Sequence, residues 1–133
     1  FKIFSQNKFD WIVVDLEHSA ISIDQASDLI RIIDLCGCRP LVRLTSNSKD
    51  LTKRVLDAGA HGIIVPMINS KDEAKKAVSY SHYMPKGVRG VGLARAQGYG
   101  SKFRLDGREK IKARSRSIKH CRIYAGVWKR GSC

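Results

Sequence analysis

Three short apolar runs, each followed by a helical pattern, limit the possible fold more than any other feature of the sequence. They are WIVVD (11–15), PLVRL (40–44) and GIIVP (62–66), and their first residues lie 29 and 22 positions apart. Continuous runs rich in Val and Ile are typical of strands that are buried on both faces of a parallel sheet. The spacing is close to the length of one unit in a right-handed βαβ array. We therefore predict an α/β protein with parallel strands.

A helix start follows each apolar run. Capping side chains precede apolar residues at helical spacing, such as Ile30 and Ile33 in the first helix, and Gly59 ends the second. The predicted caps are Ser22 with Gln25, Asn47 or Ser48, and Ser70 with Glu73. The alternation of strand and helix is that of an open doubly wound sheet or of a closed eight-unit barrel.

Ionisable residues stand at the ends of the first two runs. Asp15, Glu17 and His18 close the first run. Arg43 lies near the end of the second. Parallel strands end at one edge of the sheet, and both candidate architectures bind ligands there. We therefore expect these side chains to converge at a site.

The net charge of +13 is unevenly distributed. Residues 1–100 hold 14 Lys and Arg against 10 Asp and Glu, a balance of +4, whereas residues 101–133 hold 11 against 2, a balance of +9. We predict an α/β domain over 1–100 and a basic, atypical tail over 101–133 that is disordered or weakly helical. The glycine-rich stretch 84–100 predicts a long loop with a function.

The cysteines and the length of the apolar runs indicate the compartment. Cys36 and Cys38 are too close together for the usual zinc spacing. Cys121 and Cys133 stand alone, so we predict free, buried or partly buried thiols in a reducing compartment. No run approaches the roughly 18 apolar residues of a membrane span, and no signal-peptide pattern is visible. We predict a cytoplasmic protein without a membrane partner, and the first residue, Phe1, suggests an incomplete N-terminus.

Four stretches carry a resemblance to a known family. They are FDWIVVDLEHS (9–19), PLVRL (40–44), LDAGAHGIIVPMINSKDEAKKAV (56–78) and YMPKGVRGVGLARAQGYG (83–100). In this order and spacing they resemble the metal-dependent 2-oxo-acid aldolases of the HpcH/HpaI aldolase/citrate lyase family. The resemblance implies a TIM (β/α)8 barrel, of which this chain would hold about three to four βα units.

The resemblance also implies an activity and roles for individual residues. The family cleaves or forms 4-hydroxy-2-oxo acids through a pyruvate enolate, so a 2-oxo acid and an aldehyde are the expected partners. Asp15 and His18 match its catalytic dyad, in which His18, helped by a metal-bound water, moves the hydroxyl proton. Arg43 matches the residue that binds the 2-oxo-acid oxygens and stabilises the enolate. Glu17 matches a motif position to which no direct chemical step is assigned.

The metal ligands implied by the family have no counterpart in this chain. A divalent cation, Mg²⁺ or Mn²⁺, is expected, held by a Glu in a segment resembling I-x-Q-I-E and by a later Asp. The Glu should fall near position 122, where the chain has Arg122 in SIKHCRIYAG. A hard cation requires oxygen ligands, which an Arg-rich segment does not supply. No metal ligand is therefore assigned, and we expect residues from about 101 onward to be an aberrant end from a frameshifted or truncated reading frame.

The candidate residues have alternative, non-catalytic interpretations. His18 could begin a helix without any chemical role, and Arg43 could form a structural ion pair with Asp15 or Glu17. The other residues considered are His61 and His82, which we assign to turns or surfaces, and Trp11, which we assign to the core.

Two other functions remain open beside the lyase. A non-catalytic aldolase remnant would keep the scaffold without the metal. A polyanion or nucleic-acid binder would use the arginines of the tail, although that tail shows no recognised module and few aromatic residues. These arginines are Arg104, Arg108, Arg114, Arg116 and Arg122. The full-length family is expected to form homo-oligomers.

Overall fold

The protein is an α/β structure in which strands and helices alternate. The computed structural model describes residues 9–100, 103–106, 110–113 and 122–126. Its elements are β1 (Trp11–Asp15), α2 (Ile23–Leu35), β2 (Arg39–Arg43), α3 (Lys49–Asp57), β3 (Gly62–Pro66), α4 (Lys71–Ser81), η1 (Arg95–Gly100), β4 (Phe103–Asp106), β5 (Lys110–Ala113) and β6 (Arg122–Gly126). The predicted order of three strands and three helices is confirmed.

The main sheet is parallel and has the strand order β1-β2-β3-β6. β1 and β2 pair so that Asp15 lies opposite Arg43, and Arg43 in turn lies opposite Ile64 of β3. β4 and β5 form a separate antiparallel pair. The register therefore aligns the carboxyl ends of β1 and β2, where the sequence predicts a site.

Serine caps begin all three α-helices of the described chain. Ser22 and Ser70 each form a complete capping box, with Gln25 and Glu73 respectively, and Ser48 accepts a hydrogen bond from the Leu51 N–H. These caps satisfy backbone donors that a helix start otherwise leaves unpaired. The sequence predicted either Asn47 or Ser48 as the cap of the second helix, and the cap is Ser48.

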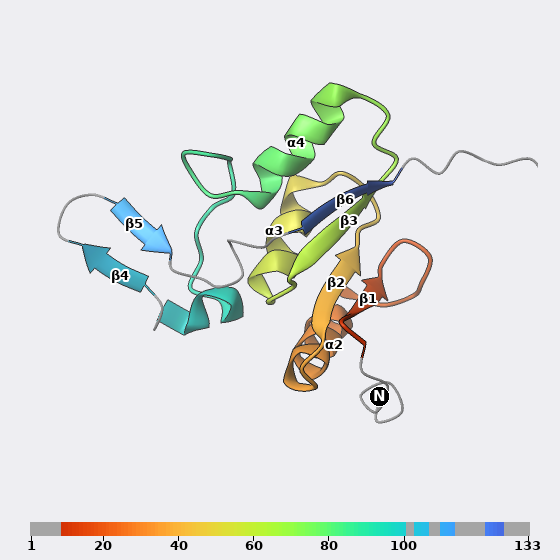
Figure 1. Ribbon diagram of the computed structural model, residues 1–133, viewed down its shortest axis with the longest axis horizontal. Coiled ribbons are helices and arrows are strands. Elements are labelled where there is room, and N and C mark those ends of the chain that lie inside the picture. The colour runs from red at the N-terminus through yellow and green to blue at the C-terminus, as the bar shows by residue number, and fades with distance from the viewer. Residues whose placement is uncertain (1–8, 101–102, 107–109, 114–121, 127–133) are drawn as a thin grey trace, which may run out of the picture.

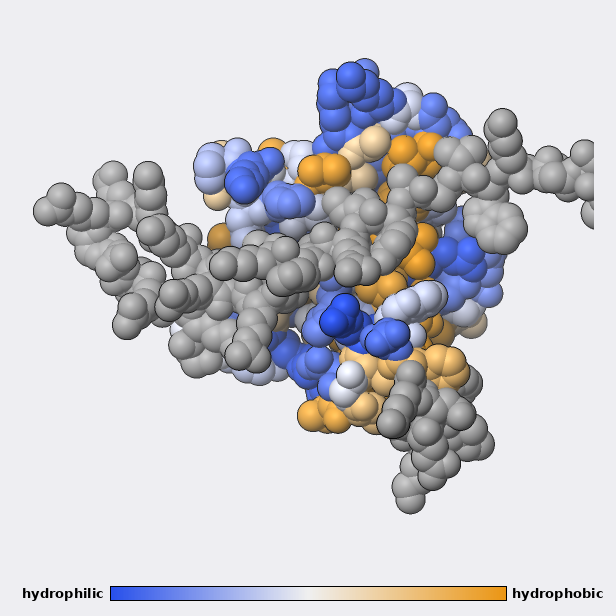
Figure 2. Space-filling view, viewed as in Figure 1, coloured by the Kyte–Doolittle hydropathy of each residue, from blue (hydrophilic) through white to orange (hydrophobic). Residues whose placement is uncertain are grey.

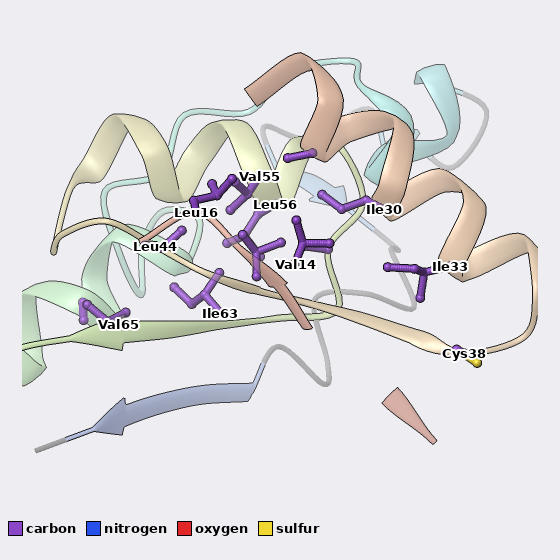
Figure 3. Close-up of a cluster of buried hydrophobic side chains, with 14 of the residues drawn as sticks. Val14, Leu16, Ile30, Ile33, Cys38, Leu44, Val55, Leu56, Ile63 and Val65 are labelled. Atoms are coloured by element: carbon purple, nitrogen blue, oxygen red, sulfur yellow. The ribbon is translucent and has the colours of Figure 1, made fainter. Parts of the chain in front are cut away.

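The core lies between one face of the sheet and the helices. Val14 and Ile63 from the strands pack against Ile30 and Val55 from α2 and α3, as Figure 3 shows. Alternate residues of a strand point to opposite faces of the sheet. The residues that follow this alternation on the core side are Val14, Leu16, Val42, Leu44, Ile63 and Val65.

The other face of the sheet carries Trp11, Val13 and Asp15 of β1 by the same alternation. Figure 2 shows hydrophobic surface over the strands on this side, while the outer end of α4 is hydrophilic. The prediction that Trp11 belongs to the core is wrong, because its side chain is more than half exposed. Trp11 lies on the face turned away from the helices, so they do not cover it.

The stretch 84–100 crosses the amino ends of the strands, away from the predicted site (Figure 1). Arg89 binds Asp57 at 2.5 Å at the end of α3, and Arg95 binds Asp34 at 2.7 Å near the end of α2. We name these two ion pairs the loop clamps. They fasten the loop to the ends of α2 and α3, which is a structural role. A further function for this loop remains a prediction.

The described part of the tail forms strands. We predicted disorder or weak helix for 101–133, whereas β4, β5 and β6 lie within this range. β6 pairs in parallel with β3 along its whole length, from Gly62 opposite Arg122 to Pro66 opposite Gly126. Its sequence, RIYAG, contains the β-branched and aromatic residues that favour strands. We did not predict this strand because the segment is short and basic residues flank it. The division of the chain at residue 100 remains a prediction.

Candidate functional site

Asp15 and Arg43 form the centre of the candidate site. They are directly opposite each other in the sheet, at the carboxyl ends of β1 and β2. Arg43 Nε donates to Asp15 Oδ1 at 2.8 Å, and Arg43 Nη2 donates to Asp15 Oδ2. Two parallel hydrogen bonds fix the plane of the guanidinium as well as its position.

Asp15 also holds the turn that follows β1. Its Oδ1 accepts from the backbone N–H of Glu17 at 2.9 Å and from that of His18 at 3.3 Å. The Ser19 hydroxyl donates to the Asp15 backbone carbonyl. Aspartate side chains commonly stabilise turns by accepting from amides two and three residues ahead. Asp15 therefore fixes the path of the chain that carries His18.

The ion pair shifts the proton affinities of both partners. The hydrogen bonds from Arg43, followed by those from the backbone amides of Glu17 and His18, hold the pKa of Asp15 well below its usual range. Asp15 in turn raises the pKa of Arg43. Both groups are consequently charged at neutral pH, so Asp15 serves as an acceptor and not as a proton donor.

Glu17 contacts both Arg43 and His18. Its Oε2 lies 3.5 Å from Arg43 Nε and 3.7 Å from His18 Nε2. The Asp15 carboxylate, by contrast, meets His18 only at the backbone amide. Sequence reasoning assigned Glu17 no step, and the strand pattern could not place it, because β1 ends at Asp15 and Glu17 lies in the turn that follows.

The remaining histidines considered in the sequence lie elsewhere. His61 Nε2 is 3.4 Å from Asp34 Oδ1, at the loop-clamp end of the sheet. His82 caps α4, and its Nδ1 lies 2.9 Å from the Val78 carbonyl oxygen. Cys36 and Cys38 are free thiols, as predicted; Cys38 is buried, whereas Cys36 is exposed and not buried or partly buried as we expected. Arg108, Arg114, Arg116, Cys121 and Cys133 lie outside the described residues.

The described residues do not fit a metal site. Within that part of the chain no three His, Cys, Asp or Glu side chains come together to hold an ion. The carboxylate best placed to do so, Asp15, is already engaged by both donors of Arg43. Hard cations need several oxygen ligands. We derive no chemical step through a metal from these residues.

The comparisons with known proteins identify the family. The model of the HpcH/HpaI aldolase/citrate lyase family matches residues 1–127. The chain belongs to this family. The HpcH/HpaI match extends through most of the stretch that we expected to be an aberrant end, which counts against that expectation.

Curated relatives in the HpcH/HpaI family are named as aldolases. A hydroxypyruvate/pyruvate aldolase of Rhizorhabdus wittichii is 38% identical over 104 residues, which are 77% of this chain and 41% of that protein. A 2-keto-3-deoxy-L-rhamnonate aldolase of Salmonella gallinarum is 35% identical over 101 residues, or 74% of this chain and 38% of that protein. The chain therefore spans about two fifths of the length of these relatives.

Solved structures of the family confirm the fold class. An HpcH/HpaI family protein from Burkholderia cenocepacia superposes with a TM-score of 0.77 at 25% identity, over 93% of this chain and 48% of that one. The citrate synthase SbnG gives a TM-score of 0.74 at 28% identity, over 95% of this chain and 45% of its own. The prediction of a partial barrel of this family is thus confirmed.

Among the helices of the described residues, none has both the length and the apolar character that a membrane-spanning helix requires.

Proposed function

We propose that this chain carries the acid–base and oxo-acid-binding residues of a carbon–carbon lyase acting on 4-hydroxy-2-oxo acids. The observation that supports this most is the fixed Arg43 guanidinium at the end of β2, next to an exposed His18 imidazole. Asp15 occupies Nε and Nη2 of Arg43. The Nη1 side remains for a planar anion such as the carboxylate or carbonyl of a 2-oxo acid.

The proposed cleavage needs one base and one cationic group. A base removes the proton of the C4 hydroxyl, the C3–C4 bond breaks, and its electron pair moves onto the C2 carbonyl, which gives an enolate and an aldehyde. The protonated base then gives its proton to C3 of the enolate, which yields pyruvate and restores the base. Charge develops on the C2 oxygen, so a guanidinium held against that oxygen lowers the barrier.

His18 is proposed as the base and Arg43 as the group that binds the oxo acid. The His18 side chain is 70% exposed, so a substrate can approach it. Imidazole changes its charge near neutral pH, as a base in this reaction must. Asp15 orients Arg43 and fixes the turn before His18, which is its proposed part in the dyad.

The wider context of the activity is also a proposal. The aldolase names of the relatives support a 2-oxo-acid substrate, whereas the aldehyde is not specified by any described residue. A divalent ion would have to be held by residues other than those described. Cytoplasmic location and homo-oligomerisation of the full-length protein remain predictions from the sequence.

The test is the exchange of pyruvate methyl protons in D₂O, followed by proton NMR. This half-reaction requires the enolate and no aldehyde, and Mg²⁺ or Mn²⁺ is added in parallel samples. We expect exchange that falls at least about tenfold in His18→Ala and in Arg43→Lys, because general-base catalysis contributes about 10²-fold or more. Asp28→Asn, on the exposed side of α2, is the control with one lost carboxylate. Exchange in wild type no faster than in buffer, or unchanged in His18→Ala, would overturn the proposal.

A further inference from the structure

Glu17 contacts the side chains of both Arg43 and His18, whereas Asp15 meets His18 at its backbone amide. Its Oε2 lies 3.5 Å from Arg43 Nε and 3.7 Å from His18 Nε2. Its side chain is 22% exposed, against 70% for His18. The more buried carboxylate is thus in a position to orient the more exposed imidazole.

The backbone holds Glu17 in this place. Its N–H donates to Asp15 Oδ1 at 2.9 Å, in the same turn that Asp15 fixes for His18. This turn brings the Glu17 carboxylate to within 3.5 Å of Arg43 Nε, next to the Asp15 carboxylate that also binds Arg43. Arg43 thus lies between two carboxylates, one in a bidentate pair and one at longer range.

We propose that Glu17 is a positioning residue, whose carboxylate orients the His18 imidazole through Nε2 and partly neutralises Arg43. This inference rests on the proposed function. The 3.7 Å between Glu17 Oε2 and His18 Nε2 is longer than a hydrogen bond, so the imidazole has to turn slightly for the carboxylate to accept from Nε2–H, and Nδ1 is then the basic nitrogen for the substrate proton. The assignment gives His18 a side-chain partner other than Asp15, which is fully engaged by Arg43.

The two effects of Glu17 on the reaction have opposite signs. Its negative charge beside Arg43 opposes the binding of an anionic oxo acid, so removing that charge strengthens binding. Its contact with His18 favours proton transfer, so removing that contact slows the chemical step. A residue that merely supported the fold would weaken binding and chemistry together when replaced.

The experiment compares Glu17→Gln, Glu17→Asp and the control Asp28→Asn. Pyruvate dissociation constants are measured by ligand-observed NMR, and methyl-proton exchange is measured at saturating pyruvate. For Glu17→Gln we expect pyruvate binding about threefold to tenfold tighter, from the loss of one nearby charge, with exchange at least about tenfold slower. Glu17→Asp keeps the charge and shortens the reach, so it should bind pyruvate as wild type does and still exchange slowly. Circular dichroism verifies that each variant is folded.

Arg43→Lys and His18→Ala separate failure of this inference from failure of the proposed function. If wild type does not catalyse exchange, or if either variant matches wild type, the proposed function falls and the Glu17 assignment falls with it. If both variants are impaired while Glu17→Gln binds pyruvate no tighter, or exchanges as fast as wild type, only the Glu17 assignment is overturned.

Discussion

Replacing Asp57 by Ala should destabilise the protein far more than replacing Asp34 by Ala, although each removes the aspartate of one loop clamp. The two ion pairs have similar lengths, 2.5 Å for Arg89–Asp57 and 2.7 Å for Arg95–Asp34. They differ in burial, because Arg89 and Asp57 are 5% and 16% exposed, whereas Arg95 and Asp34 are 23% and 36% exposed. The comparison tests the effect of burial on an Arg–Asp pair, and it favours Asp34 as the costlier loss only through the additional 3.4 Å contact of Asp34 Oδ1 with His61 Nε2.

The expected magnitudes follow from that burial. At 2.5 Å and an effective dielectric constant of about 20, the gross attraction is about 7 kcal/mol, most of which is offset by the loss of hydration. Removing one partner of a buried pair leaves an uncompensated charge and costs about 3–5 kcal/mol. The Tyr83 ring, 4.6 Å from the Arg89 guanidinium, remains as a weaker partner. The partly exposed pair should contribute at most about 1 kcal/mol.

Urea unfolding at neutral pH, followed by circular dichroism, measures the difference. We expect Asp57→Ala to lower the free energy of unfolding by about 3 kcal/mol or more, and Asp34→Ala to lower it by about 1 kcal/mol or less. Asp57→Asn retains a hydrogen-bond acceptor and should fall between wild type and Asp57→Ala. Equal losses for Asp57→Ala and Asp34→Ala would refute the argument from burial.

Two further predictions concern the backbone of the loop and the acid stability of the site. A Cβ at Gly87 would lie 2.2 Å from the Ser79 carbonyl oxygen, whereas one at Gly90 would meet nothing within 4 Å, so thermal unfolding should show a large loss for Gly87→Ala and little change for Gly90→Ala. Arg43 lowers the pKa of Asp15, so the stability that this shift supplies is fully present above about pH 5 and declines as the pH falls through the unfolded and then the folded pKa. The difference in free energy of unfolding between wild type and Asp15→Asn should therefore shrink from about pH 5 toward about pH 2, and a constant difference would contradict this.

Local patterns in the sequence were sufficient to predict the first three βα units. The apolar runs at 11–15 and 62–66 became strands with those bounds, and the second strand begins one residue earlier than predicted. Serine caps marked the helix starts because they satisfy backbone donors within a few residues. β6 was missed because its strand signal is five residues long and pairs with a segment about sixty residues earlier, which no local pattern reports.

The candidate site was predictable in its location and less so in its contacts. The convergence of Asp15 and Arg43 followed from the common edge at which parallel strands end. The turn after β1 determines which carboxylate approaches the His18 side chain. In that turn Asp15 accepts hydrogen bonds from Arg43 and from two backbone amides, so Glu17 is the carboxylate near the imidazole. The loop 84–100 was predicted without a location, because long-range contacts such as the ion pairs of Arg89 and Arg95 place it at the other end of the sheet.

The loop clamps and the candidate site lie at opposite ends of the same strands, with consequences for how such a scaffold can evolve. Substitutions in the turns after β1, β2 and β3 alter the surroundings of Arg43 and His18 without loosening the ion pairs of Arg89 and Arg95. Selection for a new substrate and selection for durability therefore act on separate sets of residues. A lineage can change what this site binds while its thermal tolerance is inherited unchanged.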